Sequence, residues 1–210
     1  MKKQKSILLM AALGLTMSAL SAQAANIQIT YLPFPITSPG TYVLASNLNC
    51  PSGQAITLNP SVSGQIIIDL NRHTISGPGA GTAVSINGYA NPILDQSSVI
   101  VRNGTIEGFE VGVAVGWTTN VQIRNITFHN NTIYHVDFNH VNLSSVSNCN
   151  FINDVTGYIY QSTGIQDYDT QGGNQFTNNH FNGRQMWTLI VWNNAQSTLE
   201  QYEFSEPPSN

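Results

Sequence analysis

Hydrophobic and polar residues alternate in short runs along most of the chain. Apolar residues two positions apart recur at Ile56/Leu58, Val84/Ile86, Val113/Val115, Val136/Phe138, Tyr158/Tyr160 and Leu189/Val191. Alternation with a period of two predicts β-strands that bury one face. No sustained 3.6-residue periodicity follows residue 24, so the pattern predicts strands and no helices.

A second motif recurs along the chain in a constant relation to these pairs. It consists of an apolar residue, any residue, an asparagine, two residues of any kind and a large apolar residue. Its asparagines are Asn71, Asn103, Asn125, Asn148 and Asn178, with Gln201 in a degenerate last copy. The intervals between these positions are 32, 22, 23, 30 and 23 residues. An interval of 22 or 23 residues accommodates three short strands joined by turns.

Three strands per repeat without a helical crossover predict an all-β solenoid of about seven coils between residues 41 and 206. Each strand pairs in parallel with its equivalent one coil on, at ~4.8 Å. Asparagine tolerates the left-handed backbone of a tight corner, so the repeated asparagines are expected to form a ladder. The apolar column is expected in the interior, and its members are Ile106, Phe128, Phe151, Phe181 and Phe204.

These features resemble the right-handed parallel β-helix proteins of the pectin-lyase-like superfamily. The resemblance rests on the asparagine ladder, the 22–23-residue period and the segment IDLNRHTI at residues 68–75. The segment TSPGTYVL at residues 37–44 is similar to the first coil of secreted members, and the likeness extends to about residue 205. It implies a right-handed parallel β-helix with a polysaccharide-facing cleft. It implies no single activity, because the superfamily includes lyases, hydrolases, epimerases and adhesins.

The N-terminus has the pattern of an export signal. Three lysines precede an apolar stretch at residues 7–20, and Ala22-Gln23-Ala24 matches a cleavage site. We therefore expect a signal peptide at 1–24, an N-terminal entry segment or cap at 25–40, the β-helix at 41–206 and a tail at 207–210. The protein is then secreted or periplasmic.

Charge is sparse and argues against two classes of protein. Lys, Arg, Asp and Glu make up 9% of the 210 residues, and hydrophobic residues make up 41%. This composition is unlike that of disordered chains or nucleic-acid-binding proteins. After cleavage no lysine remains, and 4 arginines against 11 acids give a net charge of 4 − 11 = −7. No later segment is long and apolar enough to be expected to span a membrane.

The candidate catalytic face carries Asp137. The residues expected to point outward on this strand are Ser85, Ala114, Asp137, Ile159 and Ile190, with His135 and Asn139 on the same face as Asp137. Two long turns, at 87–98 and 161–173, are expected to flank the cleft and carry Asp95, Asp167 and Asp169.

Asp137, Asp167 and Asp169 form the candidate catalytic set, with His135 or His140 as a base. Hydrolysis requires two carboxyl groups separated by about 5 to 9.5 Å, and a Ca²⁺-dependent lyase requires several carboxylates and a base. The catalytic motifs of polygalacturonases are absent from the sequence. The plainer interpretation is that these acids are solvated residues of the loops and the face.

Other residues are candidates for binding. Trp117, Trp187 and Trp192 can stack on sugars, although the last two can equally cap the end of the solenoid. Arg102 and Arg124 occupy equivalent outward positions on adjacent coils, where they either bind an anionic sugar or a carboxylate such as that of Glu107, or stay solvated. The five histidines show no zinc-ligand spacing. Cys50 and Cys149 lie four coils apart in this register and are expected to be free thiols.

The sequence therefore favours an exported, non-catalytic carbohydrate-binding or surface-interaction module. The expected partner is a polysaccharide or cell-surface glycan, without a cofactor. The alternative is a polysaccharide lyase or glycoside hydrolase acting on a uronate-rich polymer, with Ca²⁺ if it is a lyase. A third possibility is a structural protein that docks other chains through the ends of the solenoid.

Overall fold

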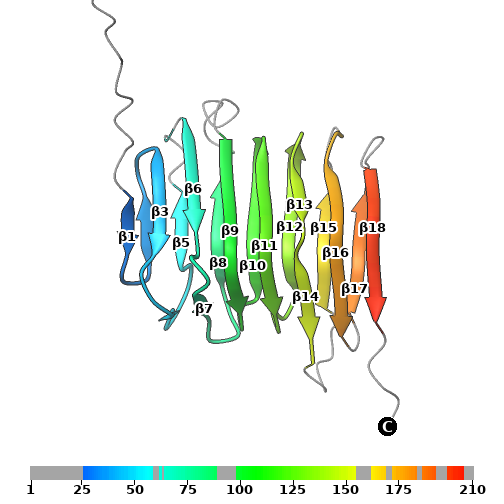
Figure 1. Ribbon diagram of the computed structural model, residues 1–210, viewed down its shortest axis with the longest axis horizontal. Helices are drawn as coiled ribbons and strands as arrows, with labels where there is room; N and C mark the ends of the chain where they lie inside the picture. The colour runs from blue at the N-terminus through cyan, green and yellow to red at the C-terminus, as the bar shows by residue number, and fades with distance from the viewer. Residues whose placement is uncertain are drawn as a thin grey trace, which may run out of the picture.

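The computed structural model describes residues 26–58, 62, 64–88, 98–154, 162–168 and 172–183, and the strand backbone of 186–192 and 198–205. Within these residues the regular structure consists entirely of β-strands (Figure 1). The expected signal peptide and the tail lie outside the described residues. No helix in the described part of the chain has the length and hydrophobicity needed to cross a bilayer.

Two parallel sheets form the walls of the solenoid, so the expected all-β parallel β-helix is confirmed. The first sheet contains β1 (Ile27–Ile29), β3 (Gly40–Leu44), β4 (Leu48–Asn49), β6 (Gln65–Asp69), β7 (Thr74–Ser76), β9 (Ser98–Glu107), β11 (Val121–His129), β13 (Ser145–Ser147), β14 (Asn150–Asn153), β16 (Gln175–Gly183) and β18 (Thr198–Ser205). The second sheet contains β2 (Phe34–Ile36), β5 (Ile56–Leu58), β8 (Thr82–Asn87), β10 (Val111–Thr119), β12 (Tyr134–Asn142), β15 (Ser162–Tyr168) and β17 (Met186–Trp192).

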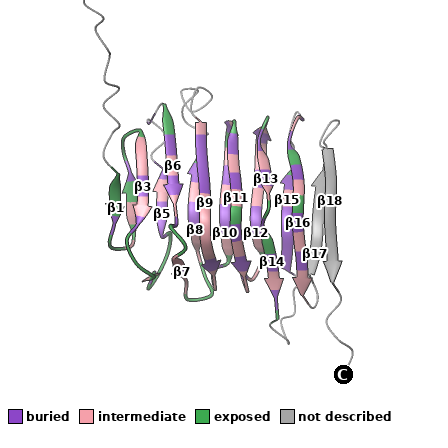
Figure 2. Ribbon diagram, viewed as in Figure 1, coloured by how far each residue is buried: buried purple, intermediate pink, exposed green. Residues whose placement is uncertain are grey.

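The expected interior column is present in the strand register. Phe128 pairs with Ile106 on one side and with Phe151 on the other, and Phe151 pairs with Phe181. The rings of Phe128 and Phe151 stack with centroids 5.1 Å apart, and those of Phe151 and Phe181 stack at 4.7 Å. Buried residues alternate with less buried ones on most strands between β1 and β16 (Figure 2). Their burial is the main stabilising contribution of each coil.

The repeated asparagines turn the corners of the first sheet. Asn71, Asn103, Asn125, Asn148 and Asn178 all have positive φ, between 52° and 62°. One direct amide-to-amide hydrogen bond of the ladder runs from Asn125 Nδ2 to Asn103 Oδ1, at 3.3 Å. At the preceding coil Asn103 donates instead to the carboxylate of Asp69. The corner conformation is thus common to all five positions, whereas the side-chain partner changes along the stack.

Three further asparagines close buried turns that the sequence pattern did not indicate. Asn131 Oδ1 accepts a hydrogen bond from the Phe109 amide, and Asn174 Oδ1 accepts one from the Ser144 amide. Asn179 does the same for the amide of Cys149. Each of these asparagines also donates through Nδ2 to a backbone carbonyl of an earlier coil. These bonds satisfy main-chain groups that the corners would otherwise leave buried and unpaired.

The strand expected at Tyr158 and Tyr160 is misplaced in the sequence interpretation. The equivalent of β12 is β15, which aligns Ile165 with Val136 and Asp167 with Phe138. The extra residues of the 30-residue interval therefore precede this strand, and most of the turn expected at 161–173 is strand instead. The polar residues Gln166 and Asp167 interrupt the apolar alternation, so the sequence pattern did not indicate β15. Tyr158, Ile159 and Tyr160 lie outside the described residues.

Two strands, β1 and β2, lie within the N-terminal entry segment or cap expected at residues 25–40. They pair in parallel with β3 and β5. Cys50 and Cys149 are both free, as the coil register predicts, and both are buried.

Candidate functional site

The outward face of the second sheet holds a shallow depression over β8, β10 and β12, with Asp137 at one side. The strand register places Ser85, Ala114, Asp137 and Gln166 side by side on β8, β10, β12 and β15. The depression measures about 190 Å³, and its lining includes Ser85, Asn87, Trp117, Asp137 and Asn139. Its neighbours Ala114 and Gly116 are small, so the strand surface beside Asp137 is open.

Asp137 is partly desolvated in this position. Burial raises the pKa of its carboxyl group from 3.8 to about 6, although a hydrogen bond from Gln166 opposes the shift. The Gln166 amide donates from Nε2 to Asp137 Oδ1 at 3.3 Å. The pKa of the neighbouring Tyr134 is also raised, by burial and by the charge of Asp137. Tyr134, Asp137 and Gln166 thus form one polar cluster that presents both hydrogen-bond donors and acceptors.

An aromatic row borders the depression. The Trp117 indole stacks on the His140 imidazole, with centroids 3.6 Å apart and planes inclined by 13°, and Tyr168 meets His140 edge-on at 6.5 Å. Trp117 and Tyr168 are exposed, at 43% and 39% of their surface. Backbone pairing continues the row to Trp192, whose side chain lies outside the described residues.

Trp117 and His140 also share an uncommon backbone conformation. Their φ angles are 53° and 55°, in the left-handed region that favours glycine and asparagine. Bulky residues held in this region cost stability, and such strain is concentrated at functional sites.

The structure separates the candidate catalytic residues. His135 points into the core beside the stacked rings of Phe128 and Phe151, fully buried, and not onto the face of Asp137 as expected. Desolvation, with a smaller contribution from the charge of His129, lowers the pKa of His135 to about 3. A group this acidic when protonated is a poor general base near neutral pH. The reason for the misplacement is that two consecutive residues, His135 and Val136, are both buried in β12.

Asp167 is also inside the solenoid and not in a flanking loop. It pairs with Phe138, is fully buried and accepts a hydrogen bond from Asn174 Nδ2 at 3.1 Å. Neighbouring positions of a strand face opposite sides of the sheet, so Gln166 and not Asp167 lies beside Asp137. Asp95 and Asp169 lie outside the described residues. No second described carboxyl group lines the depression at Asp137.

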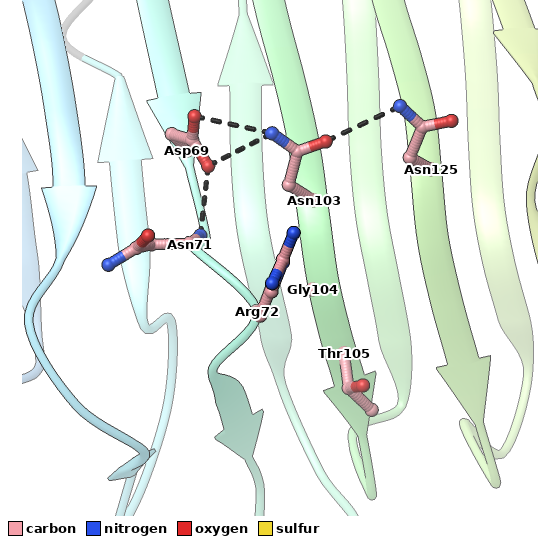
Figure 3. Close-up of a pocket in the computed structure, with 7 residues that line it drawn as sticks. All are labelled: Asp69, Asn71, Arg72, Asn103, Gly104, Thr105 and Asn125. Atoms are coloured by element: carbon pink, nitrogen blue, oxygen red, sulfur yellow. Dashed lines mark hydrogen bonds between the residues drawn. The ribbon is translucent and has the colours of Figure 1, made fainter.

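The arginine pair lies where the repeat predicted it. Arg102 and Arg124 are register partners on β9 and β11. Arg102 donates from Nε to Asp69 at 2.8 Å and not to Glu107, which contacts Ser76 and His129 instead. A polar cavity of about 650 Å³ lies at the neighbouring asparagine corner. It is lined by Asp69, Asn71, Arg72, Asn103, Gly104, Thr105 and Asn125 (Figure 3).

Sequence reasoning identified Asp137, Asn139 and Trp117 but missed Tyr134, Gln166 and Tyr168 as their neighbours. Gln166 and Tyr168 share the outward parity of β15, which was obscured because that strand was assigned to another segment. Tyr134 has the parity of the buried Val136 and Phe138, so the alternation gave no signal for it. Within the described residues, no three His, Cys, Asp or Glu side chains form a group suited to a metal ion. No protein-family model, curated protein or solved structure matches this chain, so the fold and the geometry of its surfaces alone bear on function.

Proposed function

We propose that the protein is an exported, non-catalytic module that binds polysaccharide along the outer face of its second sheet. The observation that carries this proposal is the exposed Trp117 ring, stacked on His140 beside the polar depression at Asp137. Aromatic faces offer an apolar platform, and nearby amide and carboxyl groups offer hydrogen bonds to hydroxyl groups.

The periodicity of the face supports a repeating ligand. Equivalent residues recur once per coil at ~4.8 Å, so a chain of sugar rings meets polar groups on several strands in succession. Asn87, Asn139, Gln166 and Ser85 supply neutral donors and acceptors. A neutral polysaccharide suits this face best, because a carboxylate would be repelled by ionised Asp137.

The same geometry favours binding over hydrolysis. Asp137 has the raised pKa of an acid catalyst, but glycoside hydrolysis generally requires a second carboxyl group facing the same sugar. Asp167 does not provide it because its side chain is buried in the core. The alternative of a lyase or hydrolase therefore has less support than the binding module.

The test is affinity electrophoresis of the purified protein in gels containing a panel of neutral and acidic polysaccharides. We expect retardation by at least one neutral polymer, reduced about tenfold in apparent affinity by Trp117→Ala. Tyr31→Ala is the matched control, since Tyr31 is an aromatic residue with 59% exposure in the first coil, away from the depression. It should bind like the wild type.

Two results would overturn the proposal. Absence of binding across the panel, or equal binding by Trp117→Ala and the wild type, would remove the role of the aromatic row. Release of reducing ends or unsaturated products that is abolished by Asp137→Ala would replace the binding module with the enzyme.

A further inference from the structure

Every arginine side chain that the structure describes lies at one corner of the solenoid. Arg102 and Arg124 are partners on adjacent coils, and Arg72 lines the cavity beside them. The part of the sequence after the expected cleavage site contains no lysine and one further arginine, Arg184. In a chain with so few charges, three cations at one place are a notable concentration.

The one carboxylate that the described residues place at this corner is already engaged. Asp69 accepts hydrogen bonds from Arg102 Nε at 2.8 Å, from Asn103 Nδ2 at 3.3 Å and from the Asn71 amide at 2.9 Å. It occupies the position next to Arg102 in the ladder, on the side away from Arg124. Its charge therefore compensates Arg102, and it forms no ion pair with Arg72 or Arg124.

Arg124 has an unmet hydrogen-bonding requirement. Its Nε atom is buried and has no partner, and no ion pair joins Arg124 or Arg72 to any carboxylate in the described part of the chain. The next residue in the same column is Ser147, which carries no charge. A buried donor without an acceptor costs stability, and turning the guanidinium group outward onto an oxygen ligand would remove that cost.

The stacking of the arginines is itself unfavourable. Like charges directly opposite each other on neighbouring strands destabilise a sheet, and the spacing here is ~4.8 Å. A destabilising arrangement of this kind is common where a protein gives up stability for binding.

We propose that this corner binds the oxyanion groups of an acidic polysaccharide, namely its carboxylates or sulfates. A guanidinium group donates two parallel hydrogen bonds to such an oxyanion, and two arginines one coil apart can bind a single group or successive groups of one polymer. Arg72 and Thr105 line the cavity at the adjacent corner, where the Thr105 hydroxyl can donate to a further oxygen. This site lies on the first sheet, apart from Asp137, and rests on the proposed function only in taking the ligand to be a polysaccharide.

The experiment compares binding of polygalacturonate, dextran sulfate and neutral dextran by the wild type and Arg124→Gln. We expect Arg124→Gln to lose about tenfold or more in affinity for the acidic polymer that the wild type binds, with binding of neutral polymers unchanged. Raised salt should weaken the wild-type interaction, because exposed charges are screened. Without ligand, Arg124→Gln should melt about 1 to 3 °C higher than the wild type, which also verifies its folding.

Arg184→Gln removes the same charge from another part of the sequence and is the matched control. Equal losses in the two variants would show a general charge effect and overturn the site, as would unchanged affinity in Arg124→Gln. Binding of free sulfate or phosphate but of no acidic polymer would overturn the polysaccharide assignment. Trp117→Ala separates the two proposals, because it should weaken neutral binding and leave acidic binding intact.

Discussion

Trp117 and His140 stack face to face across adjacent coils, with centroids 3.6 Å apart, and both residues adopt positive φ. The equivalent corners of the first sheet use asparagine, which accepts this conformation at low cost. At this edge of the second sheet the positions with positive φ are instead occupied by two residues with large rings, Trp117 and His140. The stack therefore combines backbone strain with an exposed aromatic surface.

Replacing Trp117 by asparagine should separate stability from binding. We expect Trp117→Asn to raise the free energy of unfolding by about 1 kcal/mol, because asparagine relieves the left-handed strain. Loss of the ring contact with His140 offsets part of this gain. Chemical denaturation measures the stability, and affinity electrophoresis should show weaker binding. A variant less stable than the wild type would argue that the φ of Trp117 carries no strain.

Asp137 should make the protein less stable as pH rises from about 4 to 6. The folded protein holds the Asp137 proton up to about pH 6, whereas the unfolded chain releases it near 3.8. The free energy of unfolding therefore falls across this interval, and the cost persists at pH 7. Asp137→Asn should remove this cost and stabilise the protein at pH 7 by about 1 to 2 kcal/mol, allowing for partial exposure.

Urea denaturation of both proteins at pH 4, 5, 6 and 7 provides the measurement for Asp137. The difference in unfolding free energy between variant and wild type should grow from pH 4 to pH 6 and then level off. A difference that is constant with pH would contradict the raised pKa of Asp137.

His135 should make the protein less stable as the pH falls, whereas Asp137 does so as the pH rises. An unfolded histidine takes up a proton near pH 6.5, but burial keeps His135 neutral until about pH 3. The free energy of unfolding should therefore fall as the pH drops below about 6.5. His135→Leu should reduce this acid sensitivity, because Nε2 of His135 is buried without a partner and leucine fits an apolar site.

The comparison for His135 is thermal unfolding of the wild type and His135→Leu between pH 4 and 7. The two proteins should be similar at pH 7, since Asn131 Nδ2 keeps its bond to the Ile106 carbonyl. At pH 4 the variant should be the more stable by about 2 kcal/mol or more. Parallel pH profiles would refute the assignment of His135 to the core.

The two thiols should be unreactive in the folded protein. Cys50 and Cys149 are buried, and burial raises the pKa of Cys149 to about 12. The thiolate is the reactive form, so alkylation by iodoacetamide at pH 8 should be slow until denaturant is added. Mass spectrometry after unfolding should then show two labels per chain. Rapid labelling without denaturant would contradict the burial, and absence of labelling after denaturation would indicate a disulfide.

Residues with a fixed place in the repeat were predictable from the sequence. Phe128, Phe151 and Phe181 recur at one position of the motif, and a parallel stack requires such residues to be neighbours. The pairing of Arg102 with Arg124 follows from the same register. His135 and Asp167 were misassigned because a polar residue in an alternating pattern is read as outward-facing.

The sequence by itself determined the class of fold, the asparagine corners and the interior aromatic column. These features depend on periodicity, which is a property of the chain alone. Only the tertiary structure decided which strand follows β12, which carboxyl group faces solvent and which arginine buries an Nε atom without a partner. The physical reason is that an insertion of a few residues shifts a strand's register, and a shift of one residue exchanges its buried and exposed faces.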